Sequence, residues 1–289
     1  FPPQKQDVQP GKEHGMEPKP RAVRPSYKPA DKLKGKVALV TGGDSGIGRA
    51  VCYLFALEGA TVAFTYVPVH EDKDASDTIN MLREVKTNDA KEPMKIPVNV
   101  GFDDNCKKVI DQVVSAFGFI DILVNNAAEQ HIVPNIEDLQ PEQLERVFRT
   151  NIFSMFYMVR HAVKHMEEGS SIINSTSVTA YKGSPALLDY TATKGAIVAF
   201  TRGLSLQLVK RGIRVNEMNS DSIKIAGVAP GPIWTPLIPS SVPEEKHTEH
   251  FGEQVPMCRA GQPDEVAPSY VFLASEDSSY FTGQILHPN

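Results

Sequence analysis

Apolar residues follow two patterns that alternate along this chain: short continuous runs, and longer stretches in which they recur every three or four residues. The first pattern is typical of buried strands, and the second of helices with one buried face. The runs predict strands at residues 36–41, 61–66, 95–100, 120–124, 171–174, from 213 onward and at 284–286. The spaced stretches predict helices at residues 46–57, 74–86, 103–117, 141–167, 190–210 and 263–273.

The alternation of strands and helices predicts an α/β fold. Helices that connect parallel strands cover both faces of the sheet, and right-handed crossovers give a doubly wound arrangement, here of about seven strands. Ligands of such folds bind beyond the carboxyl ends of the strands. We therefore expect one domain, residues 34–289, with its site along that edge of the sheet.

Residues 1–33 differ in composition from the rest of the chain. They are rich in proline, lysine, glutamate and glutamine and poor in aliphatic side chains. Because such a composition buries little apolar surface, we interpret the segment as a disordered or extended arm. Three roles stay open: a flexible tail, an arm that packs on a second subunit, and a binding element for a partner or a membrane surface.

Charge and composition narrow the classes of function. The formal net charge is −5 and the pI is about 5.9, which argues against nucleic-acid binding because a phosphate backbone requires a basic face. No apolar run approaches the roughly 18 residues of a membrane span, and none follows the first residues as in a signal peptide. The three cysteines form no pattern typical of a metal site or of disulfides, which favours the cytoplasm.

A glycine-rich turn, residues 41–48 (Thr-Gly-Gly-Asp-Ser-Gly-Ile-Gly), joins the first predicted strand to the first predicted helix. Glycine lets the backbone approach a ligand closely, and a helix N-terminus directs free N–H groups and partial positive charge at the turn. A pyrophosphate suits that position. Because the turn opens the strand–helix series, it predicts dinucleotide binding.

The second predicted strand ends at Thr65 and Tyr66, without the acid that normally holds the ribose 2′-hydroxyl of NAD. We therefore expect NADP or NAD as the cofactor, with a slight preference for NADP. Arg49 and Lys73 are candidate cations for a 2′-phosphate, and both are equally compatible with an ordinary surface position.

Several motifs, in this order, resemble those of the classical short-chain dehydrogenase/reductase family. The glycine turn resembles its Thr-Gly-x3-Gly-x-Gly motif, and residues 125–128 resemble its Asn-Asn-Ala-Gly motif, with Ala128 in place of the last glycine. Residues 230–235 resemble its Pro-Gly-x3-Thr stretch. The family's catalytic tetrad is matched by Asn151, Ser177, Tyr190 and Lys194. Residues 9–14 and 283–289 are similar to a subgroup, the plant glucose and ribitol dehydrogenase homologues.

The resemblance implies a Rossmann fold and an NAD(P)-dependent oxidoreductase that interconverts an alcohol and a carbonyl. It also implies a homo-oligomer, a dimer or a tetramer, and the subgroup suggests a sugar or polyol as the small-molecule substrate. No metal, nucleic acid or membrane partner is implied. The cofactor-binding residues carried over are Gly42, Asp44, Ser45, Gly46, Ile47, Gly48, Tyr66, Asn99, Val100, Asn126, Ala127, Ala128, Tyr190, Lys194, Pro230, Gly231, Ile233 and Thr235. Candidate substrate contacts, by position, are Glu129, Gln130, Val178, Leu187 and Leu188.

The spacing of Tyr190 and Lys194 gives these residues a chemical role of their own. Residues four apart on a helix share one face, and a nearby ammonium stabilises a phenolate whose ordinary pKa is about 10. We therefore expect Lys194 to lower the pKa of Tyr190, which acts as the general acid/base. The resemblance implies that Ser177 holds the substrate oxygen and that the carbonyl of Asn151 binds a water linked to the lysine.

An apparent insertion, residues 217–227, separates the predicted sixth strand from the Pro-Gly stretch. Either the insertion bulges out after Asn216, or residues 223–227 take over the strand, and their pattern favours the second arrangement. A displaced Pro-Gly stretch would leave a cofactor-binding protein with impaired turnover, which is the alternative function. An enoyl reductase is a further alternative, although those enzymes usually space tyrosine and lysine more widely.

Overall fold

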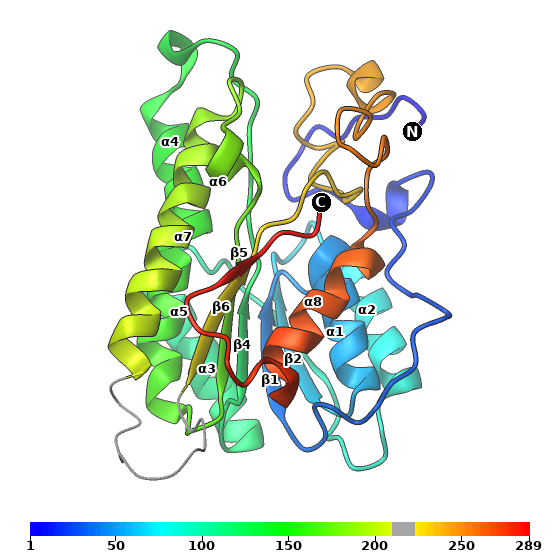
Figure 1. Ribbon diagram of the computed structural model, residues 1–289. Coiled ribbons are helices and arrows are strands. Elements are labelled where there is room, and N and C mark those ends of the chain that lie inside the picture. Colours follow the sequence, from blue (N-terminus) through cyan, green and yellow to red (C-terminus); the bar gives the residue numbers. More distant parts are fainter. Residues whose placement is uncertain (210–222) are drawn as a thin grey trace.

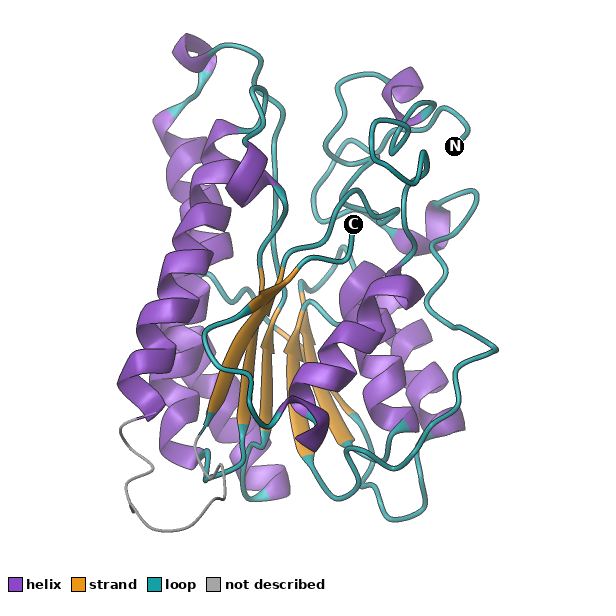
Figure 2. Cartoon of the chain, viewed as in Figure 1, coloured by secondary structure: helices purple, strands orange, loops and turns teal. Residues whose placement is uncertain are grey.

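A single parallel sheet forms the centre of the protein. The structure is a computed structural model, and it describes residues 1–209 and 223–289. Helices flank the sheet on both faces (Figure 1, Figure 2). Its strand order is β3-β2-β1-β4-β5-β6-β7, which confirms the predicted doubly wound fold. The strands are β1 (Val37–Thr41), β2 (Thr61–Tyr66), β3 (Met94–Pro97), β4 (Ile122–Asn125), β5 (Ser171–Ser175), β6 (Lys224–Val228) and β7 (Ile285–Leu286).

The position of the site follows from the strand order. The chain moves outward from β1 through β2 to β3 and then returns to the other side of β1, where β4 pairs with it. The connections therefore diverge at the carboxyl ends of β1 and β4, which opens a crevice between them. β1 and β2 are buried along their whole lengths, as expected for strands covered on both faces.

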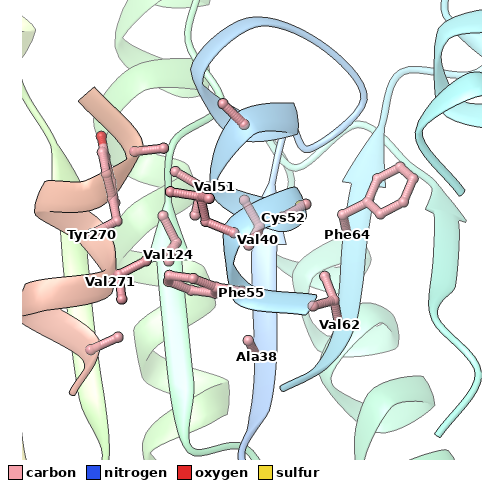
Figure 3. Close-up of a cluster of buried hydrophobic side chains, with 14 of the residues drawn as sticks. Ala38, Val40, Val51, Cys52, Phe55, Val62, Phe64, Val124, Tyr270 and Val271 are labelled. Carbon is pink, nitrogen blue, oxygen red and sulfur yellow. The ribbon is translucent and has the colours of Figure 1, made fainter. Parts of the chain in front are cut away.

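Two layers of helices enclose the sheet. One layer contains α1 (Gly46–Leu57), α2 (Asp72–Val85) and α8 (Pro263–Ala274), and the other contains α3 (Asp103–Phe117), α4 (Pro141–Phe148), α5 (Ser154–Ala162) and α7 (Leu188–Val209); a short α6 (Thr179–Lys182) precedes α7. Apolar side chains of α1 and α8, including Phe55 and Val271, pack on Val40 and Val124 of the sheet (Figure 3). This dry packing gives the strand ends a rigid base.

Two predicted elements differ from the observed ones. The helix predicted at 141–167 is interrupted by a π-helical turn at Arg149–Phe153 and ends in a 3-10 turn at Val163–His165. The strand predicted from residue 213, and residues 217–222 of the insertion, lie outside the described residues. The sixth strand is β6, whose Lys224 pairs with Ser171 of β5, so the arrangement in which residues 223–227 take over the strand is confirmed.

The N-terminal arm, residues 1–33, runs in an extended course over its own domain and lies beside the segment between β6 and α8 (Figure 1). Met16 and Leu33 are buried. The indole Nε1 of Trp234 donates to the Pro18 carbonyl at 2.8 Å, and Arg21 pairs with Asp264 of α8 at 2.5 Å. Within the described ranges, no helix combines the length and the apolar character that crossing a membrane requires.

Candidate active site

A cavity of about 840 Å³ lies at the carboxyl ends of the strands, where the strand order predicts a ligand. It brings together most of the residues predicted from the sequence. Those that line it are Gly42, Asp44, Ser45, Gly46, Ile47, Tyr66, Asn99, Val100, Asn126, Ala127, Ala128, Glu129, Gln130, Ser177, Val178, Leu187, Tyr190, Lys194, Pro230, Gly231, Ile233 and Thr235. Gly48, Asn151 and Leu188 do not line it, and the side chain of Leu188 is exposed.

The glycine turn forms a cradle that larger residues would fill. Gly42 and Gly46 have φ angles of 65° and 52°, which glycine adopts without strain. A Cβ on Gly46 would lie 3.0 Å from Cγ2 of Thr235, so the turn and the segment after β6 are in close contact. A Cβ on Gly48 would lie 1.9 Å from the Gly42 carbonyl oxygen, so Gly48 serves the packing of the turn. The cradle at the N-terminus of α1 fits a pyrophosphate.

The end of β2 holds acidic rather than basic side chains. Arg49 is buried and bound to Glu13 and Asp74, and Lys73 pairs with Asp77 at the surface, so neither predicted cation lines the cavity. Asp44 and Glu71 line it instead. Burial raises the pKa of both carboxyl groups, and the charge of Asp44 raises the pKa of Glu71 further. Glu71 was missed because it lies five residues beyond the strand end, where no sequence pattern marks it.

Tyr190 and Lys194 lie on one face of α7, as their spacing predicts. Their side chains are buried, and Nζ of Lys194 is 5.1 Å from the centre of the Tyr190 ring. The lysine also donates to the Ser175 carbonyl at the end of β5, at 3.0 Å. Strand and helix together therefore fix the lysine against the tyrosine.

The expected lowering of the Tyr190 pKa is wrong, because the pKa of this side chain is raised. Burial raises the pKa of Tyr190 to about 12, and only a hydrogen bond with Ser177 acts against it. Burial also lowers the pKa of Lys194 to about 7. In a dry site the cost of charging each group exceeds the attraction between the charged forms. Near neutral pH, Tyr190 therefore keeps its proton, whereas Lys194 is present in both its protonated and its neutral form.

Asn151 acts through its side chain rather than at the cavity surface. It lies in the π-helical turn and is fully buried. Its Nδ2 donates to the Glu129 carbonyl at 2.9 Å and to Thr193 Oγ1 at 3.1 Å, while its Oδ1 accepts from the Glu129 N–H at 2.9 Å. Asn151 thus fixes the segment after β4 against α7. The water-binding role of its carbonyl stays a prediction.

A charged cluster forms part of the wall beside the segment after β4. The Glu129 carboxylate accepts from Thr150 at 2.6 Å and from His131 at 3.1 Å, and it pairs with Arg146 at 2.8 Å. Burial opposes its charge, but these partners outweigh burial and lower its pKa. The residues of this wall therefore present fixed polar groups to a ligand.

Three further lining residues, which no sequence pattern marks, belong to the N-terminal arm. Gln9, Pro10 and Gly11 line the same cavity as Tyr190 and Lys194. Composition alone identified the arm as extended and polar. No pattern in residues 1–33 indicates which residue of the domain, more than a hundred positions away, each of them contacts.

A family model and several known proteins are similar to this chain over most of its length. The family model described as enoyl-(acyl carrier protein) reductase matches residues 42–289. Glucose and ribitol dehydrogenase of Daucus carota is 68% identical over 100% of this chain and 96% of its own length. NADPH-dependent aldehyde reductase 1, chloroplastic, of Arabidopsis thaliana is 67% identical over 99% and 96%. A short chain dehydrogenase from Burkholderia cenocepacia, solved in complex with NADP, is 26% identical, with a TM-score of 0.78 over 89% of this chain and 98% of its own.

Proposed function

The chain belongs to the short-chain dehydrogenase/reductase family as an NAD(P)-dependent oxidoreductase acting on CH–OH groups, and we propose that it interconverts aldehydes with polyols or sugar alcohols. Tyr190 is the proposed general acid/base. The observation that carries the proposal is the convergence of Ser177, Tyr190 and Lys194 on one cavity with the glycine cradle. The polar wall around Glu129 supports a substrate rich in hydroxyl groups, as do the names of the two plant relatives.

The proposed chemistry divides between the cofactor and the side chains. The nicotinamide, when bound, supplies or accepts the hydride. In reduction Ser177 holds the carbonyl oxygen and Tyr190 delivers its phenolic proton to that oxygen; in oxidation both act in reverse. Because Tyr190 is neutral in its buried position, it is ready to donate. Lys194, protonated, stabilises the phenolate that remains. Placed proton transfer contributes about 10²–10⁴-fold to such a rate.

The proposed holders of the cofactor are the turn residues at the N-terminus of α1, the Asn126–Ala128 segment and Thr235. NADP is the proposed form, as supported by the absence of an acid at Tyr66, by the NADPH-dependent relative and by the NADP complex of the structural neighbour. Burial and the neighbouring Asp44 raise the pKa of Glu71 to about 10, so a neutral Glu71 reduces the negative charge that a 2′-phosphate would meet. A higher kcat/KM with NADPH than with NADH is the expected result.

Two observations weigh against the alternatives. Tyr190 and Lys194 are four positions apart, whereas enoyl reductases usually space this pair more widely. The full pairing of β6 with β5, and the position of residues 230–235 at the cavity, argue against turnover impaired by the insertion.

A panel of aldehydes, polyols and sugars, assayed with NADPH, NADH and the oxidised cofactors, tests the proposal. Tyr190→Phe serves as the blank because it removes the phenolic proton and leaves the ring in place. Turnover of small aldehydes or polyols that vanishes in the variant is expected. Turnover that is equal in the variant would exclude Tyr190 as the proton donor.

We also propose that the chain forms a homo-oligomer, a dimer or a tetramer, and works in the cytoplasm. Exposed apolar side chains on the α4–α5–α7 layer, among them Phe153, Phe156 and Leu206, support a subunit contact there. Light scattering of the purified protein tests the assembly. The name of the Arabidopsis relative places that protein in the chloroplast, so fluorescence microscopy of the tagged full-length protein tests the compartment.

A further inference from the structure

The N-terminal arm contributes a wall to the active-site cavity, through Gln9, Pro10 and Gly11. These residues belong neither to the glycine turn nor to the tetrad. They come from a segment about 180 positions before Tyr190 in the chain (190 minus 9 is 181). Their position raises the question of what the arm does there.

The side chain of Gln9 connects two segments that are distant in sequence. Its Oε1 accepts from the Gln130 N–H at 3.1 Å, and its Nε2 donates to the Gln130 carbonyl, so the amide pairs with both polar groups of one peptide residue. The same Nε2 reaches the Ser240 carbonyl at 3.3 Å. One amide therefore joins the segment after β4 to the segment between β6 and α8.

Residues of both segments line the cavity that Tyr190 also lines. We call residues 229–262 the β6–α8 loop; the other segment is residues 129–133. Among the described residues, no hydrogen bond or ion pair joins 129–133 directly to the β6–α8 loop. The connection runs through Gln9.

The arm around Gln9 is itself held at fixed positions. The Gln6 N–H donates to the Pro239 carbonyl at 2.8 Å. Gly11 lies so close to the β6–α8 loop that a Cβ would be 2.4 Å from the Pro236 carbonyl oxygen. Glu13 accepts from the Gly46 N–H of the glycine turn at 2.6 Å and pairs with Arg49. Gln9 thus acts from an anchored backbone, which makes its two connections specific in geometry.

We propose that Gln9 is a positioning residue for the substrate. It fastens Gln130 to the β6–α8 loop and so sets the space in which the reacting carbonyl meets Ser177 and Tyr190. This inference rests on the proposed function. It assigns to the arm a role in substrate binding, separate from the binding of the cofactor at the glycine turn.

Steady-state kinetics of Gln9→Ala tests the proposal, with Gln6→Ala as the matched control. The Gln6 side chain bonds only to Lys12 within the arm. Loss of the Gln9 hydrogen bonds is expected to raise the KM of the carbonyl substrate about tenfold, with the Kd of NADPH changed less than about twofold and kcat less than about threefold. Gln9→Glu keeps the side-chain length but loses both donated bonds, so it is expected to raise KM as well. A Gln9→Ala enzyme with the KM of Gln6→Ala would overturn the proposal.

A second measurement separates this inference from the proposed function. Trp234 is the single tryptophan of the chain, is buried in the β6–α8 loop and stacks on Phe1 at 4.0 Å. Acrylamide quenching of its fluorescence, without cofactor, is expected to rise in Gln9→Ala and Gln9→Glu and to stay unchanged in Gln6→Ala. Absence of turnover in the wild type would contradict the proposed function alone, whereas equal quenching in all proteins would contradict the role of Gln9.

Discussion

The catalytic centre and the arm-side wall of the cavity are built in different ways. Ser177, Tyr190 and Lys194 follow β5 or lie on α7, close to one another in sequence and supported by the buried sheet. The arm-side wall joins residues 9–13 to Gln130, Ser240 and Gly46, over separations of 33 to 231 positions. There the contacts are hydrogen bonds to backbone groups, and few of the arm's side chains are apolar.

This difference separates two functions within one cavity. Chemistry is carried by elements that the core makes rigid, where small displacements of reacting groups are costly. The proposed positioning of the substrate depends instead on segments that only a few polar contacts connect. The two regions also differ in how the free energy of unfolding depends on pH. Burial lowers the pKa of Lys194 in the catalytic centre, whereas burial raises the pKa of Glu13 in the arm.

The largest expected effect concerns Lys194 in the catalytic centre. Lys194→Met is expected to lower kcat by about 10²–10⁴-fold, because the phenolate of Tyr190 loses its stabilising charge. The same variant is expected to be more stable than the wild type. The folded-state pKa of about 7 lies below the ordinary value of 10.5, so the unfolded chain binds more protons between these values and wild-type stability rises with pH there.

The gain in stability of Lys194→Met therefore shrinks as the pH rises, by about 1 kcal/mol per unit between pH 7 and 10. Urea unfolding at pH 7 and pH 9 measures it. A gain that is independent of pH would show that Lys194 is not desolvated as described.

A substitution at Gly48 tests the cradle of the glycine turn and leaves the residues of the tetrad and of the arm unchanged. Gly48→Ala is expected to weaken NADPH binding about 100-fold, since its Cβ meets a backbone oxygen and must displace the turn. Gly203→Ala on α7 is the control, because a Cβ there meets no atom within 4 Å and alanine suits a helix interior. Fluorescence titration with NADPH measures both, and equal affinities would contradict the cradle.

Glu13 gives the smallest expected effect and the opposite slope with pH. Burial raises its pKa from 4.5 to about 7, so its contribution to stability is complete below pH 4.5 and is lost as the pH rises through 7. The wild type loses this contribution as the pH rises, and the variant does not. The free energy of unfolding of Glu13→Gln minus that of the wild type is therefore expected to increase by about 2 kcal/mol from pH 5 to pH 8. Urea unfolding measures the difference, and a constant difference would place the Glu13 carboxylate in solvent.

The sequence predicted what local patterns encode. The doubly wound sheet, the glycine turn and the Tyr190–Lys194 face follow from periodicity and spacing, and α1 and α3 have the predicted bounds. It failed where the tertiary environment decides. The direction of the Tyr190 pKa shift depends on burial. Arg49 forms ion pairs with Glu13 and Asp74 and so does not reach the cavity. The hydrogen bonds of Gln9 join segments that no periodicity relates.

Tyr190→Phe, assayed for both NADPH binding and substrate turnover, tests the central claim most directly. Binding within about twofold of the wild type, with kcat/KM reduced by at least about 10²-fold, is the predicted result, because the ring remains and only the proton is lost. Full turnover in the variant, at wild-type affinity for NADPH, would contradict the assignment of Tyr190 as the general acid/base.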